Sequence, residues 1–201
     1  MSPDPMADDF PSASKGNLKK DHVETENHSP FRLLSTNEAI ADNDNVTAVV
    51  LVVFTPDKEH IIAVQHHKRG VDLTAGHADE DDKHFYDTGR RELYEETGAT
   101  VGHLVPVMLM ESDYYESRQT QPQPDGQKSY MVVLTGVTND LGTFEPSKEV
   151  HERFLLTPDD FLERYDGDYP EDMTRIIENA IETIHHKHAN PPEMSHDIPE
   201  A

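Results

Sequence analysis

The hydrophobic and polar positions divide the chain into a patterned centre with an unpatterned segment at each end. The centre begins with two runs rich in β-branched residues, at 47–54 and 61–64. A turn-like Thr-Pro-Asp-Lys sequence at 55–58 separates them. Runs of this kind joined by a short turn predict a β-hairpin.

Three further strands are predicted later in the chain. Residues 101–110 and 130–137 are apolar runs of strand length, and residues 153–156 form a shorter one. Pro106 interrupts the first of these runs. Because proline lacks the N–H that a central strand needs, that strand is predicted to lie at an edge or to carry a bulge.

A helix is predicted over Phe85–Thr97. Its apolar or small residues Phe85, Gly89 and Leu93 recur every four positions, so they share one face. Gly98 follows directly, at the position where glycine commonly ends a helix. The helix is therefore delimited by a clear signal at its C-terminal end.

Two more helices are predicted at 157–165 and 170–188. Thr157 can cap the first of these helices, with Pro158 at its first position. The second carries an apolar stripe at helical spacing, which predicts a face turned to the core: Met173, Ile176, Ile177, Ala180, Ile181 and Ile184. A docking face for a partner is the alternative interpretation of this stripe.

The order of strands and helices predicts an α/β domain rather than a helical bundle or a β-sandwich. We expect the domain to span residues 30–188. Residues 1–29 are rich in Pro, Ser, Gly and Asn and predict a disordered N-terminal tail. Residues 189–201, which include Pro191, Pro192 and Pro199, predict a flexible C-terminal tail.

Composition narrows the possible functions. The 201 residues hold 17 Lys and Arg against 40 Asp and Glu, a formal net charge of −23, which favours solubility and argues against direct nucleic-acid binding. The absence of cysteine excludes disulfides, thiol nucleophiles and Cys-ligated metals. The sequence also lacks an apolar segment of membrane-spanning length and a secretory signal, so we expect a cytoplasmic protein without membrane association.

Three glutamates of the helix predicted at Phe85–Thr97 are the strongest candidates for chemistry. Glu92, Glu95 and Glu96 are spaced three and four residues apart, so their carboxylates can converge on one side of the helix. Like charges in this arrangement repel, and a hard cation such as Mg²⁺ or Mn²⁺ removes that repulsion. The alternative is a solvated acidic face, in which Arg91 holds Glu95 as an i, i+4 partner.

The residues around these glutamates resemble the Nudix hydrolases, whose box reads G-x5-E-x7-R-E-U-x-E-E-x-G-U, with U apolar. The second half of the box is matched without a gap by Arg91, Glu92, Leu93, Glu95, Glu96, Gly98 and Ala99. The first half departs from the pattern, because Gly76 plus five residues reaches Asp82 and eight residues separate Asp82 from Arg91. Counting back from Arg91 places Lys83 at the glutamate position. We therefore expect a one-residue insertion, with Asp82 or a neighbour replacing the glutamate.

The resemblance implies the Nudix fold, a mixed β-sheet sandwiched between helices, over about residues 31–188. It implies metal-dependent hydrolysis of a diphosphate bond in a nucleoside diphosphate derivative. Glu92, Glu95 and Glu96 would be the metal ligands and Arg91 would orient the glutamates, so Glu92 and Arg91 count as catalytic. The backbone of Gly76 would approach the metal or the diphosphate, since a side chain there would collide.

A later segment, 145–155, resembles the E-V-x-E-x-x-W/F-L stretch of the family. Glu149 and Glu152 are its candidates for the general base, and we prefer Glu149; the alternative role is a surface carboxylate. Substrate contacts are expected from His77, and from Lys68 and Arg69 near the mouth of the site.

Aromatic and histidine-rich segments have competing interpretations. Tyr114 is expected to stack on the base of the substrate, with Tyr115 beside it, although aromatic residues on such a loop are as often structural. The pair His66-His67 and the tract at 185–188 look like metal-binding sequences. The first straddles a strand end and the second ends a helix, where histidine suits the helix dipole, so a structural role is preferred.

The Ala75-Gly76 pair is typical of ADP-ribose-type members, so ADP-ribose or a nucleotide-sugar is the favoured substrate. A nucleoside triphosphate pyrophosphohydrolase is one alternative, and a non-catalytic Nudix domain that senses a nucleotide or binds a partner is another. An isomerase on the same fold would require a catalytic cysteine, which the chain lacks. The family also makes a homodimer an open expectation.

Overall fold

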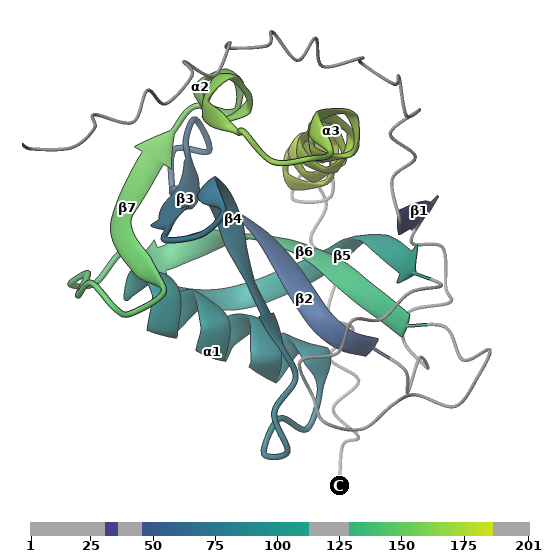
Figure 1. Ribbon diagram of the computed structural model, residues 1–201, viewed down its shortest axis with the longest axis horizontal. Coiled ribbons are helices and arrows are strands. Elements are labelled where there is room, and N and C mark those ends of the chain that lie inside the picture. Colours follow the sequence, from purple (N-terminus) through teal and green to yellow (C-terminus); the bar gives the residue numbers. More distant parts are fainter. Residues whose placement is uncertain (1–30, 36–45, 113–128, 187–201) are drawn as a thin grey trace, which may run out of the picture.

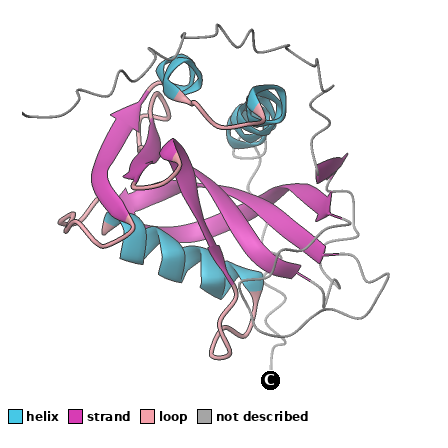
Figure 2. Cartoon of the chain, viewed as in Figure 1, coloured by secondary structure: helices cyan, strands magenta, loops and turns pink. Residues whose placement is uncertain are grey.

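The computed structural model describes residues 31–35, 46–112 and 129–186. Seven strands in these ranges form one mixed sheet, with helices on both faces (Figure 1). The helix at Phe85–Thr97 lies on one face of the sheet and the helices at Pro158–Arg164 and Pro170–His186 lie on the other (Figure 2), which confirms the predicted α/β fold with a mixed sheet between helices. The tails predicted at 1–29 and 189–201 lie outside the described residues, so their disorder stays a prediction.

The sheet is built mainly from antiparallel neighbours. In order across the sheet the strands are β1 (Phe31–Ser35), β5 (Thr100–Ser112), β6 (Ser129–Asp140), β2 (Val46–Phe54), β4 (Gly70–His77), β3 (Ile61–His66) and β7 (Val150–Leu156). Only β2 and β6 pair in parallel among the described strands, with Val46 opposite Tyr130 and Phe54 opposite Val137. The central pair of the sheet therefore joins segments that are far apart in the sequence.

The predicted hairpin of β2 and β3 exists only at its turn. The two strands pair at a single position, Phe54 opposite Ile61. Beyond that position β4 lies between them, with Val49 of β2 opposite Gly76 of β4 and Val64 of β3 opposite Asp72. The insertion of β4 brings the Ala-Gly pair of the box into the middle of the sheet.

Two strands were not predicted from the hydrophobic pattern. The first is β1, which pairs with the end of β5. The second is β4, whose sequence GVDLTAGH contains two glycines and an aspartate, residues with low strand propensity. The strands at 101–110, 130–137 and 153–156 are confirmed in longer form as β5, β6 and β7.

Pro106 lies in an interior strand, because β5 has β1 on one side and β6 on the other. β1 pairs only with Met108–Ser112, however, so Pro106 itself has β6 alone beside it among the described strands, and the predicted bulge is present: the β5–β6 register shifts between Pro106 and Met108. The bulge accommodates a residue that cannot donate to the ladder.

One face of the sheet is covered by α2 (Pro158–Arg164) and α3 (Pro170–His186) (Figure 1). Thr157 caps α2 by accepting a hydrogen bond from the Asp160 N–H at 3.1 Å. The predicted stripe of α3 packs into the core with Phe54 and Val133, and Ile176, Ile177 and Ile184 are almost fully buried. The docking interpretation of the stripe is therefore wrong.

The opposite face is covered by α1 (Phe85–Thr97), whose bounds are those predicted. Leu93 is buried among Val49, Leu51 and Leu134 of the sheet. Gly98 has φ of 71°, in the left-handed region that glycine adopts without strain, and its N–H donates to the Tyr94 carbonyl at 2.8 Å. These contacts fix α1 against β2 and β4, so its outer carboxylates lie beside the end of β4.

Candidate active site

Gly76 near the end of β4 lies directly against the Glu92 side chain of α1. A Cβ atom on residue 76 would overlap the carboxylate of Glu92, so only glycine leaves room for that side chain. The predicted need for glycine at this position thus has a direct structural reason. The side chain that would collide is Glu92, a predicted metal ligand. Glycine at position 76 therefore lets the Glu92 carboxylate lie close against β4.

Glu96 lies one turn further along α1 and is the most deeply buried of the three glutamates, with 8% of the residue exposed. Its Oε2 accepts a hydrogen bond from the Ala75 N–H at 3.3 Å. Burial, and next the negative charge of Glu92, raise the pKa of Glu96 from its ordinary 4.5 to about 7. Burial also raises the pKa of Glu92. The two carboxylates therefore lie close together in a site that penalises their charged forms.

Arg91 holds the residues around this pair. Its Nη1 contacts Oε1 of Glu92 at 2.8 Å and Oε2 of Glu95 at 3.5 Å. Its Nη2 donates to the His77 carbonyl and contacts Oδ2 of Asp82, both at 2.8 Å. One guanidinium thus links α1 with both ends of the 77–82 loop, and these partners raise the pKa of Arg91.

Asp82 occupies the place at which the first half of the box departs from the family pattern. Its two oxygens face Arg91, with a second contact of 3.4 Å from Nε to Oδ1, and Oδ2 also accepts from the Asp79 N–H at 3.0 Å. The hydrogen bonds from Arg91 lower the pKa of Asp82 to about 2. Lys83 is exposed. Asp82 is thus placed to support the loop and the helix, as expected for a residue replacing the glutamate.

Glu95 differs from the other two predicted ligands. Its side chain is 57% exposed, and it contacts the guanidinium of Arg91. The structure therefore brings Glu92 and Glu96 together and leaves Glu95 on the solvent side of α1. A role as metal ligand stays a prediction for all three residues.

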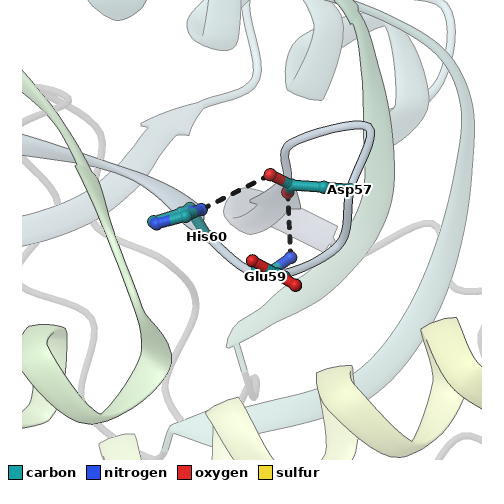
Figure 3. A group of neighbouring side chains, drawn as sticks. All are labelled: Asp57, Glu59 and His60. Atoms are coloured by element: carbon teal, nitrogen blue, oxygen red, sulfur yellow. Dashed lines mark hydrogen bonds and ion pairs between the residues drawn. The ribbon is translucent and has the colours of Figure 1, made fainter.

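A different group in the described part of the chain has three potential ligand atoms close enough together to hold a metal ion. Asp57, Glu59 and His60 have one potential ligand atom each within 4.8 Å of one another (Figure 3). They lie in the β2–β3 turn, where Asp57 accepts hydrogen bonds from the Thr55 hydroxyl at 2.5 Å and from the Glu59 N–H at 3.0 Å. This side-chain bonding to the local backbone is typical of a turn and accounts for the arrangement without a ligand.

Glu149, the preferred general base, lies where the 141–149 loop meets the edge of the sheet. Its carbonyl accepts a hydrogen bond from the His67 N–H at 2.9 Å, and its own N–H donates to the Ser147 hydroxyl at 3.1 Å. Its side chain is exposed, as is that of Glu152, which lies opposite Gln65 on β3. Within the described residues no hydrogen bond or ion pair joins either carboxylate to Glu92 or Glu96, so the base stays a prediction.

The predicted substrate contacts lie around the β3–β4 turn and the end of β4. Lys68 is exposed, and Arg69 pairs through Nε with Oδ2 of Asp72 at 3.0 Å. His77 is exposed at the end of β4, and its carbonyl is held by Arg91. Asp72 was missed from the sequence, although its position two and four residues before Thr74 and Gly76 places all three on one face of β4.

The aromatic and histidine candidates are the last of the predicted site residues. Tyr114 and Tyr115 lie outside the described residues. The ring of His67 lies 3.3 Å from that of His151, centroid to centroid, and His185 is exposed in the last turn of α3. Among the residues that the structure describes, these histidines do not join a three-ligand group like that of the β2–β3 turn.

Comparison with known families decides the classification. A family model described as the NUDIX domain matches residues 44–178. The chain belongs to the Nudix family. The predicted family, fold and class of enzyme, a Nudix hydrolase, are confirmed at this level, whereas the subgroup is not resolved. No curated protein matches the sequence.

Solved structures of the same fold cover most of this Nudix chain. A point mutant of the Bacillus subtilis pyrophosphohydrolase BsRppH has a TM-score of 0.58 at 13% identity, over 77% of this chain and 90% of that one. The NUDIX domain of Shewanella oneidensis NrtR, complexed with ADP ribose, has a TM-score of 0.53 at 20% identity, over 74% and 94%. A C. elegans Ap4A hydrolase has a TM-score of 0.51 at 16% identity, over 70% and 98%.

No helix in the described ranges is both long enough and apolar enough to cross a membrane.

Proposed function

We propose that this Nudix protein is a metal-dependent pyrophosphohydrolase that cleaves a diphosphate bond in a nucleoside diphosphate derivative. One observation carries the proposal: α1 and β4 hold the Glu92 carboxylate against Gly76 and the Glu96 carboxylate at the Ala75 N–H, while Arg91 contacts Glu92 and the 77–82 loop and makes no hydrogen bond or ion pair with Glu96 among the described residues. A structural ion-pair network would place the cation between the two carboxylates. Here Glu96 is buried without a cationic hydrogen-bond partner among the described residues.

The residues fit a hard divalent cation, Mg²⁺ or Mn²⁺. Such ions prefer carboxylate oxygens, and burial, which raises the pKa values of both Glu92 and Glu96, leaves these two carboxylates with few waters to solvate their charge. Glu92, Glu96 and Glu95 would hold the ion. When bound, the ion withdraws charge from the diphosphate oxygens and activates water for attack on phosphorus.

The other residues have distinct proposed roles. Arg91 orients Glu92 and fixes the 77–82 loop, and Gly76 leaves the space that the Glu92 carboxylate occupies. Glu149 is the proposed general base, which removes a proton from the attacking water.

Contacts to the substrate are assigned to exposed residues around the site. Lys68, Arg69 and His77 would bind the phosphate groups, because cationic and N–H donors match their oxygens. Tyr114 is proposed to stack on the base.

ADP-ribose or a nucleotide-sugar is the favoured substrate. The Ala75-Gly76 pair is the sequence feature behind this choice, and a domain of the same fold has been solved with ADP ribose. Nucleoside triphosphates are the alternative substrates, and nucleotide sensing without catalysis is the alternative outside enzymes. A cytoplasmic location and a homodimer stay predictions.

Turnover of a substrate panel with Mg²⁺ or Mn²⁺ tests the proposal. ADP-ribose, nucleotide-sugars, dinucleoside polyphosphates and nucleoside triphosphates are incubated with the wild type, with Glu92→Gln and with Glu96→Gln. Glu59→Gln is the matched control, because it removes a carboxylate from the competing group in the β2–β3 turn.

We expect metal-dependent turnover of at least one compound by the wild type and the control, and its loss in the other two variants. Absence of turnover with the whole panel would favour the sensing role. Retained turnover in both the Glu92 and the Glu96 variants would show that the active site lies elsewhere.

A further inference from the structure

The β3–β4 turn carries an ion pair beside the carboxylate site. The turn closes at Gly70, whose φ of 78° lies in the left-handed region. Nε of Arg69 lies 3.0 Å from Oδ2 of Asp72, and the side chain of Arg69 is 46% exposed against 19% for Asp72. A half-exposed arginine is therefore anchored to a largely buried carboxylate.

Asp72 lies on the face of β4 that meets α1. Side chains alternate along a strand, so Asp72 shares its face with Thr74 and Gly76. The Cβ direction at Gly76 points at Glu92, which identifies this face as the one turned toward α1. Ala75, between them, donates its N–H to Glu96.

As far as the described residues show, the contact with Asp72 leaves most of the Arg69 guanidinium free. The pair involves Nε, and the structure gives Nη1 and Nη2 no hydrogen bond or ion pair to any described residue. Two adjacent terminal nitrogens match the spacing of two phosphate oxygens. Arg69 therefore keeps the part of its side chain that can bind a phosphate.

An arginine beside Glu96 also has a competing interaction. Glu96 is buried, and its hydrogen-bond partner among the described residues is the neutral Ala75 N–H, so an ion pair with a free guanidinium would be favourable. That ion pair would neutralise a proposed metal ligand. Asp72 offers Arg69 a carboxylate three residues away on the same turn, and the observed pair is with Asp72.

We propose that Asp72 is a positioning residue that holds Arg69 beside the carboxylate site, keeps it off the Glu96 carboxylate, and leaves its terminal nitrogens for a phosphate group of the substrate. This inference rests on the proposed function, because it requires that Glu92 and Glu96 hold a divalent cation.

Mn²⁺ binding without nucleotide tests the proposal through a double-mutant cycle. The affinity is measured by titration calorimetry, and by the electron paramagnetic resonance signal of free Mn²⁺, in the wild type, Asp72→Asn, Arg69→Gln and the double variant. Because loss of a residue supporting a metal ligand costs about tenfold or more in affinity, Asp72→Asn should weaken Mn²⁺ binding by about tenfold when Arg69 is present. In the Arg69→Gln background the same substitution should change the affinity by less than about threefold, because no arginine is released.

One further background and one conservative variant sharpen the result. Lys68→Gln removes the neighbouring exposed cation, and in that background Asp72→Asn should still weaken Mn²⁺ binding by about tenfold. Asp72→Glu keeps the charge and should retain an affinity within about threefold of the wild type. Asp72→Ser replaces Asp72→Asn in the cycle if the asparagine variant does not fold, as judged by circular dichroism.

An equal loss of affinity with Arg69 present and in the Arg69→Gln background would overturn the proposal, because Asp72 would then contribute its charge alone. This outcome leaves the proposed function intact if the wild type binds Mn²⁺ and Glu96→Gln weakens that binding. Failure of the wild type to bind Mn²⁺ would overturn both.

Discussion

Substitution of Glu96 by Gln should stabilise the metal-free protein at neutral pH. Glu96 is buried beside Glu92, so its ionisation carries a cost in the folded state that an exposed glutamate in the unfolded chain does not have. Glutamine has nearly the same shape, can accept the same hydrogen bond from Ala75, and carries no charge. The prediction is that removal of a proposed catalytic ligand increases the free energy of unfolding.

The sign and size follow from the pKa. The folded-state pKa of Glu96 is raised from 4.5 to about 7, so the folded protein holds this proton more tightly than the unfolded chain does. Stability is therefore lost as pH rises from about 4.5 to about 7, and the loss is complete above that range. At about 1.4 kcal/mol per pKa unit, the loss amounts to about 3 kcal/mol.

Urea denaturation in EDTA measures the effect. Wild type and Glu96→Gln are compared at pH 5 and at pH 8, and Glu95→Gln serves as the control because its carboxylate is exposed on the same helix. We expect the advantage of the Glu96 variant to be small at pH 5 and to reach about 2–3 kcal/mol at pH 8. The control should follow the wild type at both values. The general repulsion among the acidic residues acts almost equally on all three proteins and cancels in the comparison.

The same proteins titrated with Mg²⁺ should show the reverse order. A cation that binds only the folded state stabilises in proportion to the logarithm of its concentration over the dissociation constant, and the wild type should gain more than the Glu96 variant. The reasoning is refuted if the difference between wild type and Glu96→Gln is the same at pH 5 and pH 8, or grows toward acid pH.

Four other predictions concern separate parts of the structure. Gly76→Ala should leave the free energy of unfolding within about 1 kcal/mol of the wild type, because the group it displaces, the Glu92 carboxylate, is the end of a flexible side chain. The same substitution should lower turnover or Mg²⁺ affinity by at least about tenfold, and unchanged activity would show that the position of Glu92 against Gly76 does not matter. Asp82→Asn should lower stability by about 1 kcal/mol at pH 7 in urea denaturation, and this difference should vanish as pH falls from 3.8 toward about 2, because the pKa of Asp82 is depressed in the folded state. Glu149→Gln should reduce turnover by more than about a hundredfold if Glu149 is the base, whereas a loss of a few-fold would remove it from that role. Ile177→Ala, in the buried stripe of α3, should cost about 2–5 kcal/mol in thermal or chemical denaturation with the active site unaltered, and a change below about 1 kcal/mol would show that the stripe is loosely packed.

The elements that the sequence predicts best are those whose signals are local. The bounds of α1 follow from its four-residue spacing and from Gly98, and both act within a few residues of the helix end. The stripe of α3 is similarly explicit, because burial of one helix face requires a 3.6-residue period. For such segments the physics of the isolated element and of the folded domain agree.

The failures have non-local causes. Several residues of β4 have low strand propensity and serve the site instead. Gly76 leaves space for Glu92, Asp72 is on the same face of β4 as Gly76, and Gly70 closes the turn. The hydrophobic pattern therefore does not reveal the strand. The hairpin of β2 and β3 was overestimated because the better partner of β2 lies further along the chain.

The candidate site was predictable as far as its motif extends. Fixed spacing located Glu92, Glu96 and Arg91, and the shifted first half of the box pointed to Asp82. Asp72 carries no motif and could be found only once β4 was recognised as a strand. The relation of Glu149 to the other glutamates depends on how β7 and the 141–149 loop pack, which spacing does not encode.

The parallel pairing of β2 with β6 has a consequence for how the chain folds. These strands are more than 80 residues apart, with Val46 opposite Tyr130, so their association must close a long loop before it gains any contact energy. Such non-local pairing slows folding, and we expect β2–β6 docking to be the late, rate-limiting event. The β3–β4 turn and α1 form from adjacent segments and can assemble earlier. We therefore expect the acidic helix to form before the sheet that supports it is complete, and divalent cations present during refolding to accelerate the final step.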